Sequence, residues 1–370
     1  MNRYEKDDED GIRMASKVWL VRTEENEKAE SLRQKIRFLY ERAEMTGCFP
    51  QGNLVAVKLH FGERGNVTHI PPDLVRAVVD EIKKGGAKPF LTDTCVLYKS
   101  QRDNAVNHLL LADEHGFTVE NTGAPVLIAD GLLGSAEKEV DIPGSIYKKV
   151  SLSAVALEAN GVMVLTHVTG HMGIGMGGTI KNLGMGFASR KGKLRQHSVM
   201  KPAVSSKSCT GCGVCISWCP ADAIVMEGEI AVIDSKKCIG CGECLAFCRF
   251  DAVKYDWRVG SNDLQKRIAE HALGVVIGKT GKAAYMNFLM SVTKDCDCMG
   301  GRQISIIPDI GILASKDPVA VDAATLGLIR DESGKELTEL SYPHLDAYVQ
   351  IRHGEAIGLG SSKYELVEVA

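Results

Sequence analysis

The feature that most constrains this chain is a duplicated cysteine run. The spacing C-x2-C-x2-C-x3-C occurs twice, inside CTGCGVCISWCPADAI (209–224) and CIGCGECLAFCRFDAV (238–253). The two stretches align without gaps and hold eight of the twelve cysteines. Such a duplication predicts a small unit with pseudo-two-fold symmetry and one centre in each half.

The chemistry of the two runs favours iron–sulfur clusters. Thiolates are soft ligands, and the close spacing lets three of them surround one face of a [4Fe–4S] cubane. Gly211, Gly213, Gly240 and Gly242 let the backbone bend tightly and direct N–H groups at the sulfurs. Zinc sites use paired C-x2-C knuckles and are disfavoured by four cysteines in this spacing. Clusters with a purely structural role stay as an alternative.

The ligand sets follow from the likeness of these runs to two-cluster ferredoxins, in which the fourth cysteine ligates the other cluster. Pro220 follows the first run as in that pattern, and Arg249 takes the equivalent place after the second. The expected ligands are Cys209, Cys212, Cys215 and Cys248 for one cluster, and Cys238, Cys241, Cys244 and Cys219 for the other.

Composition and charge limit the partners and the compartment that this chain is expected to have. The 370 residues are 45% hydrophobic and 25% charged, with a formal net charge of −3, which suggests neither nucleic acid nor an anionic membrane as partner. The charged N-terminal stretch has no apolar export region, and no apolar run reaches the length of a membrane helix. A metal framework in a reducing compartment fits these cysteines, so we expect a cytoplasmic protein.

Outside the cysteine-rich segment, short apolar runs alternate with helical patterns. The continuous apolar runs are typical of parallel strands that are covered on both faces. Strands are expected at 18–22, 54–60, 89–94, 125–130, 162–168 and 304–315, and helices at 26–44, 73–84, 102–115, 262–277 and 318–330. The pattern predicts an α/β fold: a mostly parallel sheet flanked by helices, with an inserted small 2[4Fe–4S] ferredoxin-like α+β domain.

The expected domain order is an α/β domain over 1–200, the ferredoxin-like insert over 201–256, and the second part of the α/β domain over 257–370. The insert is too small to hold a core without metal. Three independent units are the alternative, because the last hundred residues contain few recognisable strands.

A glycine-rich stretch, THVTGHMGIGMGGTIKNLGMG (166–186), follows the expected strand at 162–168. So many glycines indicate that either a ligand or another segment of the chain approaches the backbone closely there. Gly173, Gly175, Gly178 and Lys181 form a candidate anion site. The three glycines match G-x-G-x-x-G, but the expected acidic strand end does not follow, which disfavours a dinucleotide site. Residues 181–207 carry seven Lys or Arg and no acidic residue, consistent with an anion site, a docking face for an acidic partner, or a solvated loop.

Four further residues are weak catalytic or metal-binding candidates. His167 and His171 bracket a short loop, and Cys296 and Cys298 lie in KDCDCMGG (294–301). They bind a separate metal or line a redox pocket in one interpretation. Hydrogen-bonded histidines and inert thiols are the alternative. Asp93, Asp309, Asp317 and Asp322 lie at strand ends or helix starts, where both ligand contacts and helix caps occur.

Taken together, these segments resemble the DUF362 family of iron–sulfur proteins over nearly the whole chain. The resemblance rests on 55–94, 167–186, the double cysteine run, CDC (296–298) and PDIGILASKDPVAVDAA (308–324). It implies an α/β domain with an inserted two-cluster ferredoxin domain and a general role in electron transfer. Thr169 stands where the family's H-x-K-G-H motif has lysine, so the anion-binding role of that lysine is not carried over.

Three functions follow as hypotheses. The first is a ferredoxin-like carrier that passes low-potential electrons to a partner redox enzyme, a flavoprotein or another iron–sulfur enzyme. The oligomeric state is open, and a homodimer is the possible assembly that base rates favour. The second is an oxidoreductase with its own flavin, metal or substrate site over residues 170–186. The third is an iron–sulfur sensor or assembly factor.

Overall fold

A central sheet of eight strands organises the larger part of the chain. The computed structural model describes residues 15–197, 201–238, 244–245, 248–250, 252–255 and 260–369. The strand order is β16-β1-β15-β14-β7-β2-β3-β4. The bounds are β1 (Ser16–Arg22), β2 (Leu54–Lys58), β3 (Lys88–Asp93), β4 (Val126–Ile128), β7 (Gly161–His167), β14 (Ala283–Leu289), β15 (Gly311–Ser315) and β16 (Tyr364–Val369).

The sheet is mostly parallel, as the sequence predicts. Strands β14, β7, β2, β3 and β4 pair in parallel, and β15 runs antiparallel to both β14 and β1. Strand β14 follows residues 201–256 in the chain and yet lies between β7 and β15. Segments from both sides of the cysteine-rich region therefore build one sheet.

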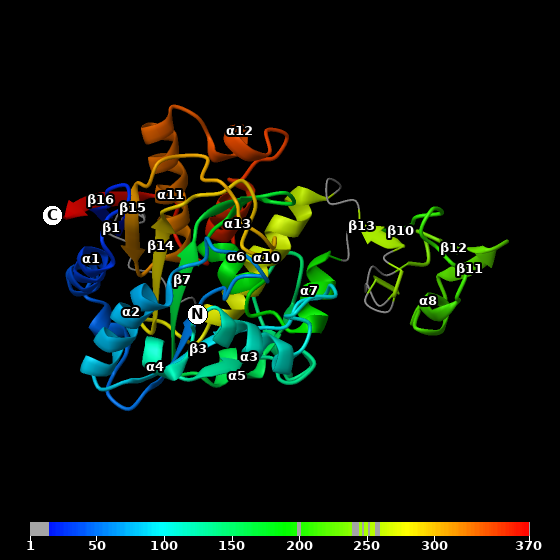
Figure 1. Ribbon diagram of the computed structural model, residues 1–370, viewed down its shortest axis with the longest axis horizontal. Helices are drawn as coiled ribbons and strands as arrows, with labels where there is room; N and C mark the ends of the chain where they lie inside the picture. The colour runs from blue at the N-terminus through cyan, green and yellow to red at the C-terminus, as the bar shows by residue number, and fades with distance from the viewer. Residues whose placement is uncertain are drawn as a thin grey trace.

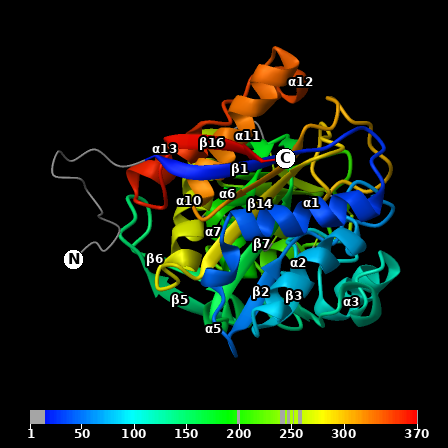
Figure 2. The ribbon, with the colours of Figure 1, turned by 90° about the vertical axis from the view of Figure 1, so that its left-hand side faces the viewer.

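Alternate residues of the strands point into two separate cores, one on each face. On β7, Val162 and Val164 belong to one core, whereas Met163 and Leu165 belong to the other. Burial on both faces explains why these strands are continuously apolar in sequence. Figure 2 shows helices on both sides of the sheet.

The first core is covered by α6 (Thr179–Gly184), α10 (Ser261–Val276), α11 (Pro318–Ser333), α12 (Leu337–Ser341) and α13 (Val349–Ala356), and the second by α1 (Ala29–Arg42), α2 (Pro72–Lys84) and α3 (Ala105–Glu114). Shorter elements are η1 (Met45–Cys48), α4 (Val119–Thr122), α5 (Ala154–Glu158), α7 (Arg190–His197), and the hairpins β5 (Glu137–Asp141) with β6 (Lys149–Ser153) and β8 (Thr169–His171) with β9 (Gly175–Gly177).

Local signals account for the helix ends. Helix α2 begins at Pro72, where the missing N–H costs nothing, and ends before Gly86, whose φ of +81° favours glycine. Helix α11 begins after Asp317, whose side chain accepts hydrogen bonds from the N–H groups of Val319 and Ala320.

The cysteine-rich segment forms a small unit at one side of the sheet (Figure 1). Strand β10 (Pro202–Val204) pairs antiparallel with β13 (Val253–Tyr255), and β11 (Ile224–Glu227) forms a hairpin with β12 (Ile230–Ile233). Helix α8 (Val214–Ser217) carries Cys215.

Two predictions about strands need correction. The last hundred residues are not short of strands, because β14, β15 and β16 all lie there. Within 304–315 only β15 is a strand, since Pro308 and Asp309 interrupt the run, and Ile304 is 85% exposed.

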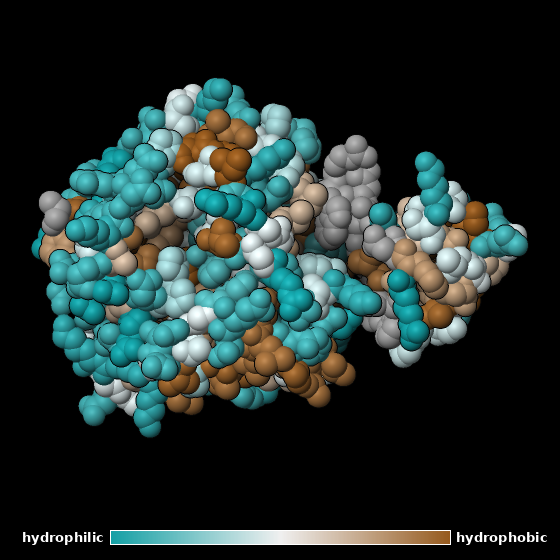
Figure 3. All heavy atoms as spheres, in the orientation of Figure 1, coloured by the Kyte–Doolittle hydropathy of each residue, from teal (hydrophilic) through white to brown (hydrophobic). Residues whose placement is uncertain are grey.

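The surface carries an apolar patch over α3 and the loop after β4, seen at the lower side of the sheet domain in Figure 3. Its exposed side chains are Val106, Leu109, Leu110, Leu132 and Leu133. Within the described ranges, no helix is both long and apolar enough to cross a bilayer.

Candidate functional site

Charged side chains gather where the parallel strands end. Strand β2 ends at Lys58, β3 at Asp93 and β7 at His167, and the loop after β14 leads to Cys296. The carboxyl ends of neighbouring parallel strands lie along one edge of the sheet, where ligands bind in many α/β proteins. The fold therefore brings residues from four distant segments to one place.

Lys58, Asp93 and Arg102 form a buried charged centre. Lys58 Nζ lies 2.9 Å from Asp93 Oδ1, and Arg102 Nη1 lies 4.0 Å from Asp93 Oδ2. Burial opposes ionisation of Asp93, but Lys58, His108 and Arg102 outweigh it and lower the pKa of the carboxyl. The Asp93 carboxylate is thus held charged inside the protein.

Arg102 connects this centre to the loop after β2. Its guanidinium contacts Glu63 Oε2 at 3.2 Å, His60 Nε2 at 2.8 Å and the Tyr98 hydroxyl at 2.5 Å. Burial, together with Arg102 and Lys58, lowers the pKa of His60 well below its ordinary value. His60 is therefore neutral at pH 7.

Lys181 adds a cation to the same site. Burial lowers its pKa to about 8, and Arg102 and Lys58 contribute to this shift, against the opposing effect of Asp297 and Asp93. Its ammonium forms no hydrogen bond or ion pair within the described ranges. A charged group without a fixed partner inside such a site is available to a bound anion or to proton transfer.

Asp297 anchors the loop that carries the two cysteines. Its carboxylate accepts hydrogen bonds from His167 Nδ1 at 2.9 Å, from Thr68 Oγ1 at 3.0 Å and from Asn66 Nδ2 at 3.3 Å. The other ring nitrogen of His167 donates to the carbonyl oxygens of Met290 and Ser291, both at 3.1 Å.

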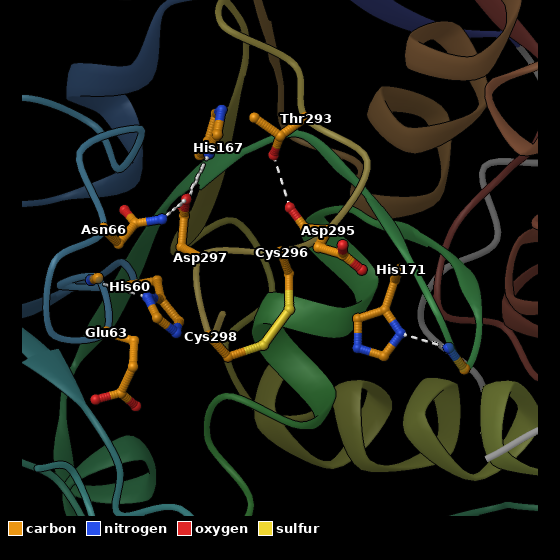
Figure 4. Close-up of a disulfide and its surroundings, with 12 residues drawn as sticks. His60, Glu63, Asn66, His167, His171, Thr293, Asp295, Cys296, Asp297 and Cys298 are labelled. Carbon is orange, nitrogen blue, oxygen red and sulfur yellow. Dashed lines mark hydrogen bonds and ion pairs between the residues drawn. A yellow bond between two sulfur atoms is a disulfide. The ribbon is translucent and has the colours of Figure 1, made fainter. Parts of the chain in front are cut away.

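His167 therefore donates from both ring nitrogens, as an imidazolium does. Burial alone lowers its pKa, but Asp297 and the two carbonyl groups reverse the shift and raise it. In Figure 4, His167 and Asp297 lie on the side of the loop away from the sulfurs. The structure thus uses His167 as an anchor for the loop and leaves it no free nitrogen for a metal.

His171, Cys296 and Cys298 are brought together. The two cysteines form a disulfide, and a ring nitrogen of His171 and both sulfurs lie within 4.8 Å of one another. The Gly173 N–H donates to His171 Nδ1 at 3.0 Å, and Figure 4 shows the other ring nitrogen turned toward the disulfide. Burial, with Lys181 and His197, lowers the pKa of His171 well below its ordinary value, so the ring is neutral.

A pocket of about 530 Å³, lined mainly by residues with polar or charged side chains, reaches one end of the disulfide. Its lining residues are Glu63, Tyr98, Lys99, Ser100, Gln101, Asp103, Asn107 and Cys298. Cys298, but not Cys296, lines this pocket.

The glycine-rich stretch folds against the protein's own side chains. Gly173 lies in the turn between β8 and β9, and Gly175 has a φ of +81°. A Cβ at Gly178 would lie 2.7 Å from both carboxylate oxygens of Asp322. Because Asp322 accepts from the N–H groups of Thr179 and Ile180 at 2.8 Å each, its carboxylate fills the place of an anion at the start of α6. Of the four candidate anion-binding residues, Lys181 faces the charged centre.

The four singled-out aspartates have different roles. Asp317 and Asp322 bind the first N–H groups of α11 and α6, and Asp309 accepts from the Ser291 N–H at 2.6 Å. Asp93 is part of the charged centre.

Basic residues of the 181–207 segment mostly face the protein itself. Lys193 is buried and donates to Thr94 Oγ1 and to the Ala188 carbonyl, both at 2.6 Å. Lys191 pairs with Glu139 at 2.9 Å, and Arg195 lies over the Tyr147 ring at 4.8 Å.

In the small unit, cysteines of both runs share one apolar core. Its members include Cys209, Cys215, Cys219, Cys244 and Cys248. Burial raises the pKa of Cys215, and Cys212, Cys209 and Cys248 contribute in the same direction. Cys248 of the second run therefore lies near cysteines of the first. Cys241, Gly240 and Gly242 fall outside the described residues.

The two halves of the unit repeat their backbone contacts with the cysteines. The Ala223 N–H donates to Cys219 Sγ, and the equivalent Ala252 N–H donates to Cys248 Sγ, both at 3.3 Å. The N–H groups of Gly211 and Ala231 lower the pKa of Cys209. Gly211 and Gly213 have φ of +67° and +71°, which permits the tight turns of the first run.

Sequence reasoning missed Lys58, Arg102, Glu63 and His60. Lys58 ends an apolar strand, and His60 and Glu63 follow it in HFGERG (60–65), so a polar cluster directly after a buried strand was the available signal. Arg102 had no comparable signal in the sequence, because only the fold brings it to the strand ends.

Comparisons with known proteins place the chain in a family. No curated protein matches it. Among solved structures, the lactate racemase apoprotein from Thermoanaerobacterium thermosaccharolyticum aligns with a TM-score of 0.39 and 12% identity, over 73% of this chain and 50% of that one. The chain thus spans about half the length of that protein. The family model described as a domain of unknown function, DUF362, matches residues 55–327, and the chain belongs to the DUF362 family.

Proposed function

We propose that this chain is an iron–sulfur electron-transfer protein, which holds two [4Fe–4S] clusters in residues 201–256 and passes low-potential electrons to a partner redox enzyme. The observation that carries the proposal is the repeated placement of backbone N–H groups on Cys219 and Cys248. N–H groups directed at cysteine sulfur stabilise the thiolate form that binds iron and tune the cluster potential.

The donor set fits such clusters. Soft thiolates from both runs share one small core, and the nearness of Cys248 to Cys215 supports the crossed ligand sets. When bound, the clusters supply one-electron chemistry. Cys212 is exposed, so the cysteine-rich unit presents one ligand at the surface, where a partner protein can dock.

The test is chemical analysis of protein purified without oxygen. We expect about eight iron and eight sulfide per chain, with the EPR spectrum of reduced [4Fe–4S] clusters. The double variant Cys296→Ser/Cys298→Ser is the matched control and should keep the same content. A chain that binds zinc and no sulfide would overturn the proposal.

The second candidate is an oxidoreductase with a site of its own. It is favoured by the convergence of Lys58, Asp93, Arg102 and Lys181 at the strand ends beside the pocket, since strongly shifted pKa values in one place are common at active sites. Release of a flavin or of an additional metal on denaturation would support it. The amount of flavin or additional metal released should be the same in the wild type and in variants of Cys219 or Cys248.

A further inference from the structure

The Cys296–Cys298 disulfide differs from a structural crosslink in its position. It joins residues only two apart in the chain. In the chain-entropy account, a crosslink stabilises less as the loop it closes becomes shorter, so this disulfide adds little to stability. Cys48 and Cys95 are buried free thiols.

Contacts independent of the disulfide hold the surrounding loop. Asp297, between the two cysteines, is bound by His167, Thr68 and Asn66. On the other side, Gln303 accepts from the Asp295 N–H and donates to the Cys296 carbonyl, both at 3.2 Å. The Gly170 N–H donates to the Thr293 carbonyl at 2.8 Å. The two sulfurs are therefore kept close together whether or not they are bonded, as a reversible dithiol requires.

The two sulfurs differ in access. Cys298 lines the pocket, and Cys296 does not. An attacking thiolate must approach a disulfide sulfur directly, so a small molecule in the pocket reaches Cys298 and leaves Cys296 as the departing sulfur.

His171 is suited to receive that departing thiolate. Its Nδ1 accepts the Gly173 N–H, so in the neutral ring the proton is on Nε2. That nitrogen faces the disulfide in Figure 4 and can donate a hydrogen bond to a thiolate formed there. The same protonation disfavours His171 as a metal ligand, because ligation needs a free lone pair on Nε2.

From this arrangement we infer that Cys296 and Cys298 are a redox-active disulfide that exchanges with a low-molecular-weight thiol bound in the pocket. The residues that line the pocket include one cation, Lys99, and two acidic residues, Glu63 and Asp103. Such a lining suits a thiol that bears both a carboxylate and an ammonium group. The inference is independent of the proposed electron-carrier function.

The proposed exchange has two steps, and together they conserve atoms and electrons. A thiolate attacks Cys298 Sγ, the Cys296–Cys298 bond breaks, and its electron pair goes to Cys296 Sγ, which accepts the hydrogen bond of His171. A second thiolate then attacks the sulfur of the bound small molecule and releases Cys298. Two small thiols become one small disulfide, and their two protons end on the two cysteines.

The test uses the full-length protein and L-cysteine as the probe. Trypsin cleavage after Lys294 and Arg302 releases a peptide, 295–302, whose cysteines are Cys296 and Cys298 alone. In air-equilibrated protein this peptide should carry no alkyl group after treatment with iodoacetamide, and two after incubation with L-cysteine. Alkylation of both cysteines before any reduction would overturn the inference. The peptides of Cys48 and Cys95 are internal controls and should stay unlabelled until the protein is unfolded.

Single variants test the direction of attack. With L-cystine as probe, and with rates corrected for the thiolate fraction of each cysteine, Cys298 in Cys296→Ser should form a mixed disulfide about tenfold faster than Cys296 in Cys298→Ser. Equal rates would refute attack from the pocket. Gln101→Trp should slow the reduction of the wild-type disulfide, whereas Gln34→Trp, on the exposed face of α1, should not.

Two further comparisons test recognition and positioning. Lys99→Ala should slow reduction by L-cysteine and leave the rate with 2-mercaptoethanol unchanged, and equal slowing of both would refute recognition of a charged thiol. His171→Phe should move the pH profile of Cys296 alkylation to higher pH, and His171→Gln, which keeps an N–H donor, should restore it. An unchanged profile in His171→Phe would remove His171 from the mechanism.

Discussion

Lys58 and Asp93 form an ion pair of 2.9 Å at the ends of two neighbouring parallel strands, with side chains only 1% and 6% exposed. Removing one partner of a buried pair leaves the other charge uncompensated, at a cost of about 3–5 kcal/mol. We expect Lys58→Met to lower the free energy of unfolding by this amount, measured by chemical unfolding with circular dichroism. Lys84→Met, which removes an exposed ammonium paired with Glu41 and Glu81, should cost less than about 1 kcal/mol.

The sign of the pH dependence follows from Asp93. Its folded pKa is lowered, so its contribution to stability is present above the unfolded pKa and is lost as the pH falls through the folded pKa. Lys58→Met should weaken this acid dependence. A variant as stable as the wild type, with the same acid profile, would contradict the buried pair.

Glu270 fixes the segment between β5 and β6 to helix α10. Its carboxylate accepts hydrogen bonds from the N–H groups of Ser145, Ile146 and Tyr147 at 2.7–2.8 Å. Burial raises its pKa, but His353, the N–H groups of Ile146 and Tyr147 and the Ser145 hydroxyl outweigh burial and lower it to about 2. Glu270→Gln should reduce the free energy of unfolding by roughly 2–3 kcal/mol at pH 7, because an amide offers one acceptor in place of a charged carboxylate.

The cost of Glu270→Gln should depend on pH. A lowered folded pKa contributes stability that is complete above the unfolded pKa of about 4.3 and is lost between there and about 2. The difference between variant and wild type should therefore shrink on acidification. Glu368→Gln, at an exposed pair with Arg22, is the control and should cost less than about 1 kcal/mol.

The contribution of Asp322 to stability should depend on pH in the opposite direction to that of Glu270. Burial raises its pKa to about 6, against the opposing effect of its hydrogen bonds from Ile180, Asn287 and Thr179. A carboxyl with a raised folded pKa contributes stability at low pH and loses it as the pH rises through that pKa. Asp322→Asn cannot lose a proton, so its stability relative to the wild type should increase by about 2 kcal/mol between pH 4.5 and 7.5.

The control for this prediction lies on the same helix. Asp331→Asn changes an exposed carboxylate near the end of α11 and should change the free energy of unfolding by less than about 0.5 kcal/mol. Parallel profiles for Asp322→Asn and wild type would mean that Asp322 ionises in the folded protein as it does in the unfolded chain.

Much of the sheet could be predicted from sequence, because a strand covered on both faces must be apolar throughout. Strands β2 and β7 have this character up to their carboxyl ends, whereas β3 carries Thr92 and Asp93 after Phe90 and Leu91. Strand β14 was missed because Asn287 lies in its middle. That amide donates to Asp322 Oδ1 and Thr325 Oγ1, both at 2.9 Å, so a polar residue is satisfied where sequence patterns expect an apolar one.

The candidate site was predicted only in part. Periodicity identifies strands but does not give their order, and the order decides which strand ends meet. The sequence indicated His171 because it brackets a short glycine-rich loop with His167, and Cys296 and Cys298 because they lie outside the two ferredoxin-like runs. It gave no way to see that His167 binds Asp297, or that Arg102 reaches His60, since these contacts join segments 130 and 42 residues apart.

The proposed crossed ligation of two clusters leads to a prediction that distinguishes the two halves of the small unit. Cys219 follows the first run but is assigned to the cluster of the second, and Cys248 is assigned the reverse role. Cys219→Ala should lower iron to about four per chain and make Cys238, Cys241 and Cys244 reactive toward iodoacetamide. Cys209, Cys212, Cys215 and Cys248 should stay protected in the same sample. Cys248→Ala should show the reverse pattern, and Ser217→Ala, close to Cys219 but without a sulfur, should keep both clusters. If Cys219→Ala instead exposed the first-run cysteines, each run would hold its own cluster, and the nearness of Cys248 to Cys215 would reflect packing alone.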